Sequence, residues 1–106
     1  LILWDRDEAA VKATADQLGT GATSVIPQRM DVRNREAIQE AADSIARQWG
    51  GVDVLINNAG VVTPGDFWHQ STESIETTIS VNTLGVMYVT RAFLPAMIQR
   101  PEAHLV

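Results

Sequence analysis

Three asparagines and two aspartates are the side chains in this sequence best suited to chemistry. Residues 57–60 read Asn-Asn-Ala-Gly and directly follow an apolar run, while Asn82 stands alone among apolar residues. An unsatisfied buried amide costs roughly 1–3 kcal/mol, so each of these amides needs hydrogen-bond partners. Asp5 and Asp31 each follow an apolar stretch. Side chains of these types bind main-chain groups, water or a polar ligand.

An alternation of apolar runs and helical patterns must position these side chains. The predicted strands cover 1–4, 24–30, 52–56 and the residues from 104 onward, and the predicted helices cover 7–18, 35–49 and 72–99. Gly19 and Gly21 are expected to end the first helix, and Asn34 to cap the second. The two glycines resemble a phosphate loop, but such a loop follows a strand and precedes a helix, and these do the opposite.

This order of elements predicts a doubly wound parallel sheet. Crossover connections that contain a helix pair strands in parallel, with helices on both faces of the sheet. Strands that are apolar throughout fit a sheet that is covered on both sides, and Pro27 places its strand at a sheet edge. We therefore expect one α/β domain over residues 1–106. In such sheets ligands bind beyond the carboxyl ends of the strands, which here are Asp5, Asp31 and 57–60.

Asp5 and Asp31 each allow two interpretations. In a dinucleotide-binding fold, Asp5 would bind the adenosine ribose hydroxyls and repel a 2′-phosphate; otherwise it is a helix N-terminal acid that stabilises the macrodipole. The neighbouring Arg6 could accept a phosphate, but the carboxylate favours NAD over NADP. Asp31 could accept a hydrogen bond from an adenine amino group while Val32 packs on the ring, or it could serve only the turn.

Asn82 interrupts an otherwise apolar helix face. The other members of that face are Ile75, Ile79, Val86, Val89, Phe93 and Met97. Such a face is expected to be buried, so Asn82 must bind a main-chain group, a water or a substrate-linked network. The alternative is a structural polar residue that fixes helix packing. Gly85 lies one turn further on and would permit a close backbone approach.

Composition argues against several classes of partner. The chain of 106 residues has 13 acidic and 8 basic residues, a net charge of −5. That balance argues against binding to nucleic acid or to anionic membranes, and no apolar run approaches the roughly 20 residues of a bilayer span. The absence of cysteine is compatible with a reducing compartment. His69 and His104 lack metal-ligand spacing, so no metal is expected.

Four sequence features, in this order and spacing, resemble the short-chain dehydrogenase/reductase family. They are Asp-Val at 31–32, Asn-Asn-Ala-Gly at 57–60, Ser-Val-Asn-Thr-Leu-Gly at 80–85 and Phe-Leu-Pro-Ala-Met at 93–97. The likeness spans essentially the whole chain, as the family's second strand through the start of its fifth. It implies a partial Rossmann-like domain that lacks the first strand, its Gly-rich turn and everything after the start of the fifth strand.

The resemblance also implies roles for individual residues. Asn82 matches the family's catalytic asparagine, which holds a water in the proton relay to the active-site lysine. Asp5 matches the acid that selects the ribose, so the implied cofactor is NAD, favoured by Asp5, or NADP. The other implied cofactor-binding residues are Asp31, Val32, Asn58, Ala59, Gly60 and Val81.

The family's catalytic Tyr-x-x-x-Lys does not occur in these residues. The one tyrosine is Tyr88, position 92 is alanine, and the one lysine is Lys12. Tyr88 is therefore expected in the core or at an interface, and the catalytic serine, tyrosine and lysine outside this window. Both chain ends look cut. Because a central strand would be missing, the isolated chain is expected to be unstable or to aggregate.

Together these features predict an NAD(P)-dependent oxidoreductase that transfers a hydride between nicotinamide and an alcohol, ketone or aldehyde. The fragment alone is expected to be inactive. The intact protein is expected to be cytoplasmic, and the resemblance implies a homodimer or homotetramer that forms through the long helix at 72–99 and its successor. The alternative is a non-catalytic dinucleotide-binding protein or an inactive truncated member of the family.

Overall fold

The computed structural model describes residues 1–19 and 24–106 of the chain. These residues form two compact units, Leu1–Asp31 and Val32–Val106, which are described separately below. Gly21, predicted to help end the first helix, lies outside the described residues. No helix within the described ranges is long and apolar enough to span a membrane.

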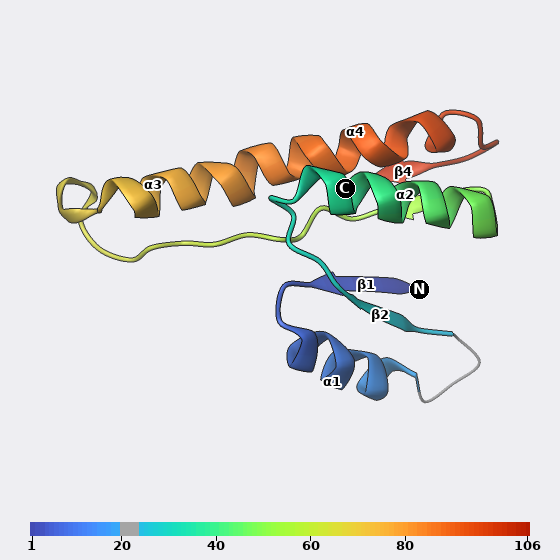
Figure 1. Cartoon of the computed structure of the whole chain (residues 1–106), viewed down its shortest axis with the longest axis horizontal. Coiled ribbons are helices and arrows are strands. Elements are labelled where there is room, and N and C mark those ends of the chain that lie inside the picture. Colours follow the sequence, from blue (N-terminus) through green and yellow to red (C-terminus); the bar gives the residue numbers. More distant parts are fainter. Residues whose placement is uncertain (20–23) are drawn as a thin grey trace. The chain divides into compact units, whose positions relative to one another are not determined.

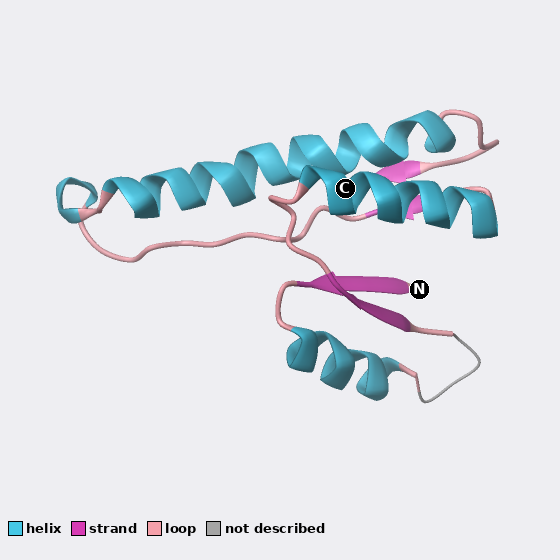
Figure 2. Ribbon diagram, in the orientation of Figure 1, coloured by secondary structure: helices cyan, strands magenta, loops and turns pink. Residues whose placement is uncertain are grey.

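The first unit is a parallel strand pair with one helix (Figures 1 and 2). Strands β1 (Ile2–Asp5) and β2 (Ile26–Arg29) pair in parallel, and helix α1 (Glu8–Leu18) packs against both. The α1 helix begins where it does because Asp7 Oδ1 accepts hydrogen bonds from the N–H groups of the next turn. The predicted strand at 24–30 is shorter than expected at both ends.

The second unit contains the remaining helices and strands (Figure 1). Two strands, β3 (Val54–Leu55) and β4 (His104–Leu105), pair in parallel, so the strand predicted at 52–56 keeps only its centre. The other elements are the helices α2 (Arg35–Trp49), α3 (Thr72–Ile79) and α4 (Val86–Met97), the 3₁₀ turn η1 (Phe67–His69) and the π-helical segment η2 (Ser80–Gly85).

Helix α2 is confirmed as predicted, because both of its ends are set by local signals. Asn34 Oδ1 accepts the Ala37 N–H at 3.1 Å and begins the helix. Gly50 ends it in the left-handed region at φ 74°. Helix α2 packs along α4 (Figure 1), and the core of this unit lies on these helices and η2. Its buried apolar residues are Ile38, Ala42, Ile45, Val81, Val89, Phe93 and Met97.

The helix predicted at 72–99 runs through α3, η2 and α4 without a break (Figure 2), but its buried face differs from the prediction. In η2 the hydrogen bonds span one residue more than in an α-helix, which rotates the preceding side chains relative to those that follow. Asn82 is therefore exposed rather than buried, and Ile79 is 51% exposed. The residues actually buried are Val81, Gly85, Val89, Phe93 and Met97.

Candidate functional site

Asn57, the first of the adjacent asparagines, links neighbouring elements by hydrogen bonds at the carboxyl end of β3. Its N–H donates to Val106 O at 2.8 Å. Its side-chain Nδ2 donates to Thr90 Oγ1 and to Val106 O, each at 3.3 Å. One residue thus connects β3, β4 and α4, which explains why an amide follows the apolar strand.

Asn82 holds the loop that follows the Asn-Asn-Ala-Gly turn. Its Nδ2 donates to Val61 O at 2.9 Å, and its Oδ1 accepts the Val61 N–H at 2.9 Å. Of the three kinds of partner that the sequence left open for Asn82, the structure shows a main-chain group, although Asn82 is not buried. Because Val61 directly follows Gly60, the two sequence features that the prediction linked lie together in space. We call this pair of hydrogen bonds the Asn82–Val61 clamp.

Asn58, Ala59 and Gly60 are exposed beside this clamp. The side chain of Asn58 forms no hydrogen bond with residues that the structure describes, so its amide is available to a ligand. A β-carbon built on Gly60 would lie 3.8 Å from Asn82 Oδ1, an ordinary contact distance. Val81, which was predicted to bind cofactor, is 6% exposed and belongs to the core on this helix; its predicted role stays a prediction.

Val32 contacts Gly85 at the other end of the same π segment. A β-carbon built on Gly85 would lie 2.8 Å from Val32 Cγ2 and 3.2 Å from Val32 Cβ. Real β-carbons do not approach other atoms as closely as 2.8 Å, so the glycine is required for this contact. The close approach that the sequence analysis expected at Gly85 is confirmed, with Val32 as its partner.

In the first unit, Asp5 ends β1 and Asp31 lies just beyond β2. Asp5 Oδ1 accepts a hydrogen bond from the Asp7 N–H at 2.8 Å. The second carboxylate oxygen of Asp5 takes no part in this hydrogen bond. Asp31 is half-buried and engaged with another group. Both carboxylates therefore lie at the carboxyl end of the parallel pair, where the prediction put them.

Arg29 is a residue of this edge that the sequence analysis missed. It pairs with Asp5 in the register of the two strands, and its Nε donates to Arg6 O at 3.2 Å. The hydrogen bond from Lys12 and its charge hold the pKa of Glu8 below the usual value, and the charge of Arg29 adds a smaller effect in the same direction. The register of β1 with β2 is the signal that could have identified Arg29.

Comparison with known proteins identifies the family. The family model described as short chain dehydrogenase matches residues 1–106. The chain belongs to the short-chain dehydrogenase family. It is 39% identical to "NADP-dependent 3-hydroxy acid dehydrogenase YdfG" of Salmonella typhi, over all of this chain and 42% of that protein. It is 35% identical to "17-beta-hydroxysteroid dehydrogenase 13" of Mus musculus, over all of this chain and 35% of that protein.

Solved short-chain dehydrogenases give the fold class. A short chain dehydrogenase/reductase from Burkholderia phymatum, solved in complex with NAD, superposes with a TM-score of 0.89 at 38% identity, over 99% of this chain and 38% of that one. The predicted α/β, doubly wound, Rossmann-like fold is therefore confirmed. The chain spans well under half the length of the relatives that it matches.

Two residues that a short-chain dehydrogenase could use in acid–base chemistry are engaged elsewhere in this chain. The Arg35 guanidinium lies 5.8 Å from the centre of the half-buried Tyr88 ring, between α2 and α4. The ammonium of Lys12 pairs with Glu8 on the surface of α1. Among the described residues, no cluster of three or more His, Cys, Asp or Glu side chains could hold a metal ion.

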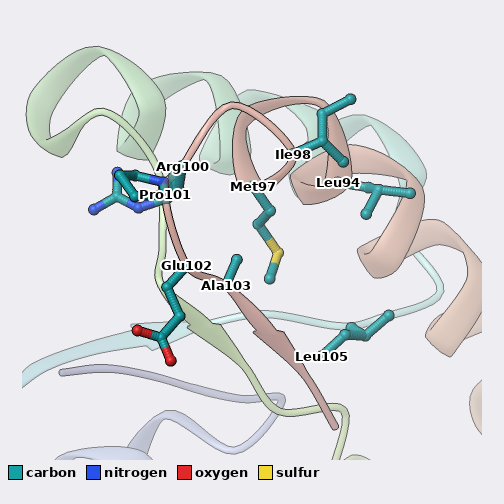
Figure 3. Close-up of a pocket in the computed structure, with 8 residues that line it drawn as sticks. All are labelled: Leu94, Met97, Ile98, Arg100, Pro101, Glu102, Ala103 and Leu105. Carbon is teal, nitrogen blue, oxygen red and sulfur yellow. The ribbon is translucent and has the colours of Figure 1, made fainter.

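A hollow of about 280 Å³ lies between the end of α4 and the chain that leads into β4 (Figure 3). It is lined by the end of α4, by the connection to β4 and by Leu105. That connection enters β4 at its amino end, whereas short-chain dehydrogenases and other doubly wound folds bind ligands at the carboxyl ends of strands. We therefore do not assign the hollow to the candidate site.

An ion pair next to this hollow stabilises the connection between α2 and β3. Arg100 Nε donates to Asp53 Oδ1, and Arg100 Nη1 donates to Gly50 O at 3.1 Å. The hydrogen bond from Arg100 holds the pKa of the Asp53 carboxyl below its usual value. The Asp53 side chain is 69% exposed, so solvent screens this ion pair.

Proposed function

We propose that this chain is part of the dinucleotide-binding domain of an NAD(P)-dependent oxidoreductase that acts on an alcohol, ketone or aldehyde. The observation that carries the proposal is the Asn82–Val61 clamp. The clamp joins the helix feature around Asn82 to the exposed turn at Gly60, at the carboxyl end of a parallel strand. Doubly wound folds bind dinucleotides at that end of the sheet.

The residues present fit a nicotinamide dinucleotide. The amide of Asn58 has no protein partner among the described residues, and Gly60 presents bare, exposed backbone next to it. Asp5 keeps one carboxylate oxygen outside its hydrogen bond to Asp7. In this proposal the cofactor-binding residues are Asp5, Asp31, Val32, Asn58, Ala59, Gly60 and Val81. The bound dinucleotide would supply the hydride acceptor or donor.

Asn82 acts in this proposal as a residue that orients the active site and supports the proton relay. Both polar groups of its side chain bind the Val61 main chain. It therefore fixes the backbone directly after Gly60, against which the reacting end of the cofactor would lie. The tyrosine and lysine that act as general acid and base in such enzymes would come from outside residues 1–106.

We propose NAD as the preferred cofactor, because the Asp5 carboxylate would repel a 2′-phosphate. The relatives do not decide the choice, since one is named as NADP-dependent and a solved one holds NAD. Arg6 and Arg29 are the residues that could weaken this preference, because Arg29 Nε binds Arg6 O beside Asp5.

A cytoplasmic location and assembly as a homodimer or homotetramer remain part of the proposal. The support for assembly is a set of exposed apolar side chains on the long helix. These are Ile79, Leu84, Met87, Leu94 and Ile98. Light scattering on the intact protein would measure its oligomeric state.

The test of the proposed function is NADH and NADPH oxidation by the intact protein, with panels of aldehydes and ketones. We expect turnover, and we expect Asn82→Ala to lower kcat by about 100-fold while cofactor affinity changes little, since small misplacements of reacting groups have effects of that size. Equal losses in kcat and in affinity would make Asn82 a purely structural residue. Cofactor binding without turnover of any substrate would favour the non-catalytic alternative.

A further inference from the structure

The contact between Gly85 and Val32 links the π segment to the proposed adenine site. Gly85 is the last residue of η2, and Val32 is the residue proposed to pack on adenine. The 2.8 Å between Val32 Cγ2 and a β-carbon built on Gly85 leaves no room for any side chain there. From the sequence alone, Gly85 is only a residue that weakens a helix. In the structure, Gly85 determines where Val32 can lie.

Neither side of this contact can relieve a clash by a small change of its side chain alone. Gly85 is buried between Val81 and Val89, which belong to the core of this unit. Moving the helix outward would open that core, and close-packed cores resist such changes. Val32 lies two residues before Asn34, whose side chain caps α2. Val32 is also β-branched and has few alternative rotamers, so a side chain at position 85 would displace it together with its backbone.

We propose that Gly85 is a positioning residue for the adenosine half of the cofactor. Without a side chain at position 85, Val32 sits against η2 and offers its outer surface to the adenine ring. A β-carbon at position 85 pushes Val32 toward the space that adenine needs. This inference rests on the proposed function, because it requires a dinucleotide that binds at Val32.

The experiment compares NADH with reduced nicotinamide mononucleotide, which lacks the adenosine. Dissociation constants of both are measured by calorimetry for the intact protein and for the variants Gly85→Ala, Val32→Ala and the double variant. Gly85→Ala is expected to weaken NADH binding by about 10-fold, which is the usual effect of losing one apolar contact with a ligand. The dissociation constant of the mononucleotide should stay the same. The matched control is Thr83→Ala, which changes an exposed residue of the same π segment.

The double variant tests whether the effect passes through Val32. Val32→Ala removes the Cγ2 atom that lies 2.8 Å from the built β-carbon. The Val32 Cβ at 3.2 Å remains, so the double variant should bind NADH nearly as well as Val32→Ala alone does, and its loss should be smaller than the sum of the two single losses. If the two losses add, or if Gly85→Ala weakens both ligands equally, Gly85 does not act through the adenine site.

The outcomes also separate this inference from the proposed function. If the unaltered protein binds neither NADH nor NADPH, the proposed function fails and the inference fails with it. If the unaltered protein binds NADH and Gly85→Ala binds it equally well, only the inference is wrong. Thermal melts of the variants check folding, because alanine normally stabilises a helix more than glycine does. A fall in melting temperature that Val32→Ala reverses would confirm the steric contact.

Discussion

The side-chain amide of Asn82 and the main chain of Val61 form a closed pair of hydrogen bonds, each 2.9 Å long. The amide acts here as a backbone substitute: it donates to the Val61 carbonyl and accepts from the Val61 N–H. The loop after Gly60 is thereby attached to a helix that lies 21 residues further along the chain.

This clamp predicts a specific ranking of variants in the intact protein. Asn82→Ala removes both hydrogen bonds and should lower the free energy of unfolding by about 1–3 kcal/mol. Asn82→Asp should lower the free energy of unfolding further at pH 7, because a carboxylate would face the Val61 carbonyl oxygen without a proton to donate. Part of that loss should return at about pH 4, where the carboxyl becomes protonated. Urea unfolding at the two pH values measures this, and equal stability of both variants at pH 7 would contradict the clamp.

Asp5 predicts the cofactor preference of the intact protein. Asp5→Asn keeps an oxygen that can accept the Asp7 N–H but removes the negative charge. The ratio of kcat/KM for NADP to that for NAD should rise by about 10-fold or more, since the repulsion of a 2′-phosphate is lost. Asp16→Asn, which removes an exposed acid from α1, is the matched control. If the ratio changes equally in both variants, the change is due to the net charge of the protein and not to the position of Asp5.

The Asp53–Arg100 pair predicts how stability depends on pH. The pKa of Asp53 is lower in the folded protein than its ordinary value, chiefly because of the hydrogen bond from Arg100. The pair therefore stabilises the fold at pH values above the unfolded pKa of about 3.9, and the contribution is lost as the pH falls through the folded pKa.

Unfolding of Asp53→Asn, measured in parallel with the unaltered protein, tests this sign. The unaltered protein should be more stable at pH 7 in low salt, and the difference should shrink as the pH falls below the unfolded pKa and vanish below the lower folded pKa of Asp53. High salt should also reduce it, because the carboxylate is exposed. Asp66→Asn is the control, since the Asp66 side chain makes no capping hydrogen bond. A difference that grew on acidification would refute the assignment.

Gly50 predicts a stability loss that depends on backbone conformation alone. Its φ of 74° lies in the left-handed region, and a β-carbon there would meet the nearest heavy atom, Arg100 Nη1, only at 3.5 Å. Gly50→Ala should therefore cost about 1–2 kcal/mol from the left-handed conformation rather than from a clash. Gly50→Asn should cost less, because asparagine tolerates this conformation. Thermal unfolding of the two variants tests the difference, and equal losses would point to sterics instead.

The 106 residues on their own are predicted to lack a cooperative thermal transition. In the described residues β1 pairs only with β2, and β3 only with β4, so each strand has an open edge. Apolar side chains at strand positions, such as Val54 and Leu105, are about half exposed. Size-exclusion chromatography and binding of a hydrophobic dye should reveal association and exposed apolar surface. A monomer with a sharp transition at high temperature would overturn this prediction.

Some of this fold could be predicted because its signals are local. Helix α2 begins at an asparagine cap and ends at a left-handed glycine, so its bounds follow from neighbouring residues alone. The family was also predicted correctly from short motifs in order, and the family model that matches residues 1–106 confirms it.

The buried face of the long helix could not be predicted in the same way. A pattern of apolar residues assumes one helical period, and the π segment at Ser80–Gly85 changes that period. The prediction therefore buried Asn82, whereas Val81 occupies the core. Arg29 was missed for a similar reason, because its bond to Arg6 depends on the register between two strands.

By itself, then, the sequence determined the order of elements, the fold class and the residues at the strand ends. Local capping, hydrophobic spacing and short motifs are sufficient for these features. Only the tertiary structure decided that Asn82 binds Val61, that Gly85 makes room for Val32 and that Arg29 stands beside Asp5. Each of those contacts joins residues that are distant in the chain, and their geometry depends on how helices and strands pack.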